Sequence, residues 1–160
     1  MSQWTPYFGA LAGVFAALTG LVFVALSINL KQILALPGVS GRALEAIVLL
    51  VEPVLVGLNG LLPDQSAHGF GLELLAVGLA GWMAANAILV AGRRALAERP
   101  VQESARRVLL VETATLLTVA AAAQLIGGVS GGLYWLAAGM ALSLVVGVLD
   151  AWVLLVEIIR

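Results

Sequence analysis

The sequence predicts an all-α membrane protein, a bundle of five transmembrane helices that forms a single integral membrane domain over residues 1–160. Of the chain, 62% is hydrophobic and 11% is charged, and the mean hydropathy is +1.09. Soluble domains carry about 25% charged residues, so this chain has too few polar side chains to cover a core in water. Five apolar stretches each reach the roughly 20 residues that a helical span requires.

The five predicted spans follow one another with short connections. They cover residues 7–30, 43–62, 70–92, 108–126 and 133–159. Helices are expected because the apolar runs exceed the 9–11 residues of a barrel strand and show no alternation, and because backbone polar groups in lipid must be satisfied internally. A signal peptide begins with a positively charged region, but the first six residues contain no Lys or Arg. We therefore expect the first stretch to remain as a span.

The positive charges predict the orientation of these spans. Cytoplasmic loops of membrane proteins are enriched in Lys and Arg. In a five-span arrangement all 8 Lys and Arg fall on one side, which predicts an outside N-terminus and a cytoplasmic C-terminus in a multi-pass plasma membrane protein. The eight residues are Lys31, Arg42, Arg93, Arg94, Arg99, Arg106, Arg107 and Arg160.

Composition excludes several kinds of chemistry and partner. The chain has no Cys, which excludes disulfides and thiolate sites, and its single His leaves too few ligands for a transition metal. We therefore expect no metal and no cofactor. A net charge of −1 offers no basic surface for nucleic acid. The expected partners are the lipid bilayer, further copies of the chain and a membrane protein partner.

Two carboxylates lie deep within the predicted spans. An ionisable side chain in hydrocarbon costs at least about 2.5–3.5 kcal/mol, so such groups are candidates for function. Glu52 lies ten residues after Arg42 and Asp150 lies ten residues before Arg160, which places each roughly 15 Å from the cytoplasmic end. We expect these two carboxylates to share one level, to be neutral at rest and to bind an ion or proton.

Both carboxylates belong to polar stripes with a seven-residue spacing, which keeps each stripe on one helix face. One stripe contains Glu45, Glu52 and Asn59, and the other contains Ser143, Asp150 and Glu157. They predict either a water-filled path, with Asn59 and Ser143 as polar lining, or a polar seam between helices. Three further acids, Glu45, Glu112 and Glu157, are expected to be interfacial residues near arginines.

Pro53 follows Glu52 directly and is expected to kink its helix. Proline lacks the N–H that would bond the carbonyl of Leu49. A buried carboxylate beside a freed carbonyl is typical of cation and proton sites. The alternative is an ordinary membrane-helix proline, with Glu52 hydrogen-bonded to a neighbouring Asn or Thr.

Small residues indicate close helix packing. Gly9 and Gly13 form a GxxxG pair, Gly78 and Gly81 open one face of the third span, and Gly139, Ser143 and Gly147 form a small stripe on the fifth.

The segment from Gly128 to Gly132 reads G-x-S-x-G and resembles the serine motif of rhomboid intramembrane proteases. His68 lies in the other outer connection, so a pair of Ser130 and His68 is topologically allowed. That family has at least six spans, and its other motifs are missing here. A glycine-rich turn accounts for the same residues, and we expect the protein not to be an enzyme.

The stretch ALAGVFAALTGLVFVALSINLKQIL at residues 10–34 resembles small uncharacterised bacterial membrane proteins, some of them labelled modulators of the FtsH protease. The resemblance covers the first third of the chain and carries no catalytic motif, and the seven-span modulator family has a different architecture. It implies a bacterial plasma membrane.

Two functions remain open after this sequence analysis. The first is a homo-oligomeric ion or proton pathway that uses Glu52, Asp150, Asn59 and Ser143. The alternative is a non-catalytic regulatory or assembly subunit whose polar stripes bind a partner's helices. The two differ in whether the polar stripes face water or protein.

Overall fold

The structure is a computed structural model that describes residues 2–35, 39–92, 101–129 and 131–159, and every regular element in them is a helix, which confirms the all-α fold. The elements are η1 (Ser2–Trp4), α1 (Thr5–Ile28), α2 (Leu30–Ala35), α3 (Val39–Gly60), α4 (Ala67–Ala91), α6 (Val101–Ile126) and α7 (Gly132–Ile159).

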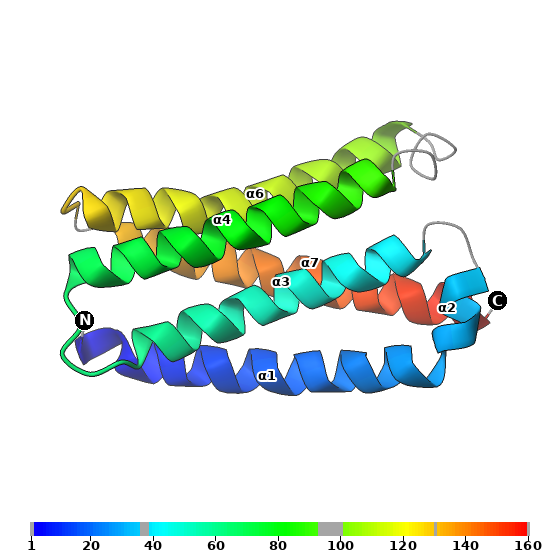
Figure 1. Cartoon of the computed structure of the whole chain (residues 1–160), viewed down its shortest axis with the longest axis horizontal. Helices are drawn as coiled ribbons and strands as arrows, with labels where there is room; N and C mark the ends of the chain where they lie inside the picture. Colours follow the sequence, from blue (N-terminus) through cyan, green and yellow to red (C-terminus); the bar gives the residue numbers. More distant parts are fainter. Residues whose placement is uncertain (1, 36–38, 93–100, 130, 160) are drawn as a thin grey trace.

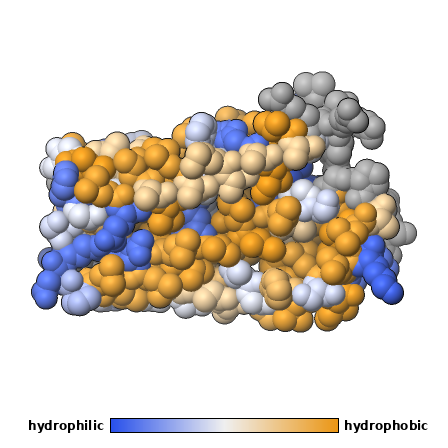
Figure 2. All heavy atoms as spheres, in the orientation of Figure 1, coloured by the Kyte–Doolittle hydropathy of each residue, from blue (hydrophilic) through white to orange (hydrophobic). Residues whose placement is uncertain are grey.

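Five helices are long and apolar enough to cross a membrane, as the sequence predicts. The segments that meet this condition are Ser2–Ile28, Val39–Gly60, Ala67–Ala91, Ser104–Ile126 and Gly132–Leu154. Figure 2 shows that apolar residues cover most of the visible face, while hydrophilic residues gather towards the ends of the bundle. A side surface of this kind suits a lipid environment, because lipid tails need no polar contact.

The structure differs from the sequence prediction in the first connection, where α2 forms a short helix. Asn29 ends α1, and its carbonyl accepts hydrogen bonds from the backbone N–H groups of Gln32 and Ile33. Ile33 is then buried in a small cluster with Val39 and Leu154. Burial of one apolar side chain against α3 and α7 explains why this polar connection is helical.

The helices lie along one common axis with the two chain termini at opposite ends (Figure 1). α3 contacts α1, α4 and α7, and α6 packs against α4 and α7. Half of the apolar window of α3 is buried (50%), against 11% for α1. α3 is therefore the central helix, and α1 lies at the edge of the bundle.

The first turns of α3 and α6 lie at the same end of the bundle as α2 (Figure 1), so Lys31, Arg42, Arg106 and Arg107 gather there. The other four predicted positive charges, Arg93, Arg94, Arg99 and Arg160, lie outside the described residues.

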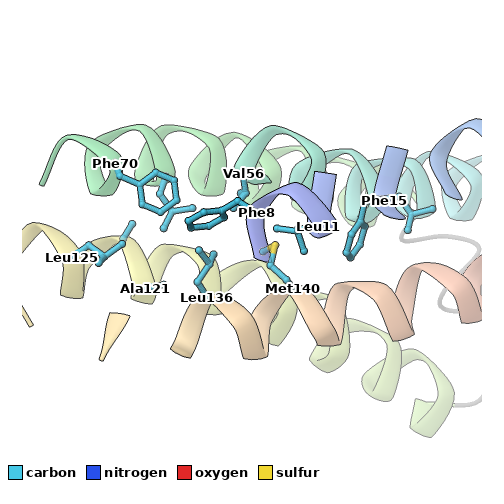
Figure 3. Close-up of a cluster of buried hydrophobic side chains, with 12 residues drawn as sticks. Phe8, Leu11, Phe15, Val56, Phe70, Ala121, Leu125, Leu136 and Met140 are labelled. Atoms are coloured by element: carbon cyan, nitrogen blue, oxygen red, sulfur yellow. The ribbon is translucent and has the colours of Figure 1, made fainter. Parts of the chain in front are cut away.

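The apolar core fills the half of the bundle near the N-terminus. Phe8 and Phe70 meet edge to face, with ring centroids 5.3 Å apart. Figure 3 shows α1 contributing Phe8, Leu11 and Phe15 to a cluster that α6 and α7 close from the other side. This core joins all five long helices without any polar group.

Glycines allow several helices to approach closely. A Cβ at Gly139 would lie 2.9 Å from Cβ of Leu117, and a Cβ at Gly147 would lie 3.0 Å from Cδ2 of Leu50. Gly9 and Gly13 differ from the expectation, because both are exposed and have nothing within 4 Å of an added Cβ. They therefore pack against no other described helix of this chain, since their face of α1 points out of the bundle.

Candidate functional site

Glu52 lies inside the bundle on α3, with only 3% of the residue exposed. The helical rise of about 1.5 Å per residue places it roughly 20 Å from Val39 and roughly 12 Å from Gly60. Neither carboxylate oxygen has a hydrogen-bond partner among the described residues. A buried carboxylate without a partner is costly and calls for an explanation.

α4 closes directly over this carboxylate at a glycine. A Cβ at Gly81 would lie 2.6 Å from Oε2 of Glu52 and 3.0 Å from its Cδ. One turn earlier, a Cβ at Gly78 would lie 3.1 Å from Cγ2 of Thr118. These glycines give the third span its open face and let α4 approach both polar side chains.

Two hydroxyls accompany Glu52 in the interior. Thr118 on α6 faces the Glu52 carboxylate, although the geometry does not close a hydrogen bond between them. Ser143 on α7 lies between Gly139, which abuts α6, and Gly147, which abuts α3. Thr118 is 0% exposed and Ser143 is 1% exposed, and neither hydroxyl has a partner within the described structure. Three helices therefore each contribute an unpartnered polar group to the interior.

Asp150 lies at a different level from Glu52, contrary to the sequence prediction. Gly147 of α7 lies against Leu50 of α3, and the two helices run in opposite directions (Figure 1). Asp150 and Glu52 therefore lie on opposite sides of this contact, roughly 7 Å apart along the axis. Oδ1 of Asp150 is 3.5 Å from Nη2 of Arg42. The prediction was wrong because it measured each carboxylate from its own helix end. Arg42 lies inside α3, where it brings a positive charge to Asp150.

Glu45 is fully buried, with 0% exposure, and is not the interfacial residue that we expected. Nε of Arg107 donates to Oε1 of Glu45 at 3.2 Å, and Nη2 of Arg107 donates to the other oxygen, Oε2. This fork geometry is the strongest form of a carboxylate pair. The sequence signal was present, because Glu45 shares its helix face with Glu52.

These two pairs form one group, which we call the four-charge cluster: Arg42, Glu45, Arg107 and Asp150. Glu45 interacts electrostatically with Arg42 and Asp150 as well as with Arg107. The cluster carries two positive and two negative side chains, and it joins α3, α6 and α7. A balanced cluster of this kind can lie within the bundle without a net charge.

The other predicted polar residues are spread along the helices. Asn59 is half-buried, and Nε2 of Gln65, in the connection after α3, donates to Oε2 of Glu73 at 2.6 Å. Nε1 of Trp82 donates to Oε2 of Glu112 at 2.8 Å, which joins α4 to α6. Pro53 is buried within an unbroken α3, and the kink that we expect there stays a prediction.

The residues proposed for a serine hydrolase are only partly described. His68 is exposed, and its Nδ1 lies 3.3 Å from the carbonyl oxygen of Ile126. Ser130 and the side chain of Glu157 lie outside the described residues. Within the described ranges, no group of three or more His, Cys, Asp or Glu side chains could hold a metal ion.

Comparisons with family models, with curated proteins and with solved structures found no match to this chain.

The Arg107 to Glu45 pair predicts a large effect on stability. Arg107→Ala leaves the Glu45 carboxylate buried without its partner, and such losses cost about 3–5 kcal/mol. The neighbouring exposed residue gives a matched control, because Arg106→Ala should change stability by less than about 0.5 kcal/mol. Reversible unfolding in detergent micelles measures both. Equal stabilities of the two variants would contradict the buried pair.

Proposed function

We propose that this protein is a membrane pathway for a small cation or a proton, with Glu52 as its central binding group. The observation that supports the proposal is the carboxylate itself, buried at 3% exposure with both oxygens unpartnered. Carboxylates in this setting cost several kcal/mol unless a positive species compensates them. A bound cation or proton supplies that compensation.

Polar groups continue along α3 on both sides of Glu52, which favours a pathway inside the chain. Beyond the C-terminal end of the Glu52 segment of α3 lie Asn59 and the hydrogen-bonded pair of Gln65 and Glu73. Towards the other end lies the four-charge cluster, which contains Asp150. In this proposal Asp150 acts at one end of the pathway, and Ser143 lines its middle.

We also propose an outside N-terminus and a cytoplasmic C-terminus in a bacterial plasma membrane. The described cations gather at the end of the bundle that holds α2 and the first turns of α3 and α6 (Figure 1), and the positive-inside rule assigns that end to the cytoplasm. The bacterial assignment rests on the resemblance of residues 10–34 to bacterial membrane proteins.

Neutralising Glu52 should abolish the flux of ions or protons into liposomes that contain the purified protein. Glu52→Gln keeps the size of the side chain but removes its charge, so we expect a fall to the level of empty liposomes. Glu112→Gln is the matched control, because its amide oxygen can still accept the bond from Trp82. Parental flux in Glu52→Gln, or no flux in the parent protein, would contradict the proposal.

A non-catalytic regulatory or assembly subunit is the second candidate. The polar stripes do not favour it, because Glu45, Glu52, Ser143 and Asp150 are all buried within the chain. The observation in its favour is the exposed face of α1, where Gly9, Gly13 and Gly20 have nothing within 4 Å of an added Cβ. Small residues on a membrane helix allow another helix to approach closely, whether from a second copy or from a partner.

Enlarging this face of α1 should reduce self-association. The double variant Gly9→Leu and Gly13→Leu adds side chains where the chain itself leaves open space, so the fold of the single chain should tolerate them. Ala80→Leu, at an exposed position of α4, is the control. We expect a smaller particle mass in lipid nanodiscs for the double variant alone. If both variants keep the parental mass, this face does not hold copies together.

A further inference from the structure

We infer that the species bound and passed on at Glu52 is a proton and not a metal cation, with the hydroxyl of Thr118 as the group that exchanges it. This inference rests on the proposed pathway and names what travels through it. Three features of the interior carry it: the number of oxygen ligands, the space around the carboxylate and the absence of a compensating charge in the described structure.

The oxygen ligands around Glu52 are too few for a dehydrated metal cation. Ca²⁺ takes 6–8 oxygens and Mg²⁺ needs an octahedral set, while potassium channels replace the hydration shell with rings of carbonyls. The described residues bring the hydroxyl of Thr118 to the Glu52 carboxylate, and they contain no group of three or more His, Cys, Asp or Glu side chains that could hold a metal ion. The carbonyl of Leu49, which Pro53 leaves without its helical donor, adds at most one more oxygen.

The space beside the carboxylate is also small. The backbone of α4 passes so close that a single methyl group at Gly81 would lie 2.6 Å from Oε2 of Glu52. On the side that α4 covers, a cation that kept its water shell would have to displace that helix. A proton needs no such space, because it occupies the oxygen itself.

The elements packed against Glu52 bring it no compensating charge. α4 presents Gly81 to the carboxylate, and α6 presents the hydroxyl of Thr118. On α3 itself the nearest acid of the same face is Glu45, which is already paired with Arg107. No charged side chain of the described residues pairs with Glu52, so a proton on its own oxygen is what neutralises it.

Glu52 and Thr118 can transfer a proton between them. A hydronium ion delivers a proton to one carboxylate oxygen, where an O–H bond forms and a water molecule is left behind. The neutral acid then donates that proton to the Thr118 hydroxyl oxygen as Thr118 passes its own hydrogen to a second water molecule, which leaves as hydronium. The bonding electron pair stays on Glu52, which returns to the carboxylate. A hydroxyl both donates and accepts, so Thr118 can pass a proton on without a net change to its own side chain.

Ion substitution in liposomes tests the inference. One set of proteoliposomes carries a pH-sensitive dye under a proton gradient, and matched sets carry Na⁺ or K⁺ gradients with cation-sensitive dyes. We expect proton uptake at least tenfold above empty liposomes, lost in Glu52→Gln, while Na⁺ and K⁺ uptake equals that of empty liposomes. Uptake of Na⁺ or K⁺ that depends on Glu52 would overturn the inference and leave the pathway standing. No uptake of any of the three overturns the pathway itself.

Thr118 provides a test that separates proton transfer from folding. Its hydroxyl has no hydrogen-bond partner, so Thr118→Val removes no bond and should unfold no more easily than the parent. We expect Thr118→Val to lose proton uptake and Thr118→Ser, which keeps the hydroxyl, to retain it. Equal uptake by the Val and Ser variants would overturn the role of Thr118.

Infrared spectroscopy tests whether Glu52 binds the proton. The carbonyl band of a protonated carboxylic acid should be present in the parent and absent in Glu52→Gln. Absence of this band from the parent at every pH would overturn the proton-binding role of Glu52.

Discussion

The cost of removing charge from water is the constraint on which the rest of this bundle depends. α3 carries Arg42, Glu45 and Glu52 along its inner side, and ionisable groups such as these cannot face lipid without a penalty. The structure meets the constraint by enclosing that side. The fork between Arg107 and Glu45 brings α6 to α3, and the pair of Arg42 and Asp150 brings α7 to the same helix. α3 therefore becomes the central helix although its own sequence is the least apolar of the five candidate spans.

Close backbone contacts also hold the other helices against α3. On one side of α3, a Cβ at Gly57 would lie 2.8 Å from the backbone nitrogen of Ala12 in α1, so only glycine permits that approach. On the others, Gly81 of α4 covers Glu52 and Gly147 of α7 lies against Leu50. Dispersion forces act over short distances, so such contacts give helix association in lipid much of its energy. The polar interior and the glycine contacts thus require the same arrangement of helices.

The sequence predicted the elements well and their neighbours poorly, for a physical reason. Span length and hydropathy are properties of one helix, and so the five helices and the burial of Glu52, Ser143 and Asp150 could be foreseen. Pairing across helices depends on which faces meet, and one sequence does not contain that information. Glu45 therefore looked interfacial, although Arg107 lies opposite it. Gly9 and Gly13 looked like a packing pair, because a GxxxG spacing does not say which side of α1 meets the bundle.

The structure places the Glu52 carboxylate against α4 of its own chain, inside the bundle. Solid-state NMR in lipid tests it directly, with labelled protein diluted into unlabelled copies so that only contacts within one chain are seen. A Cβ at Gly81 would lie 3.0 Å from Cδ of Glu52, so a through-space cross-peak between Glu52 Cδ and Gly81 Cα is expected, and it should disappear in Gly81→Leu. A Glu52 Cδ signal that instead shows contacts with lipid acyl chains and none with Gly81 would contradict the enclosed carboxylate.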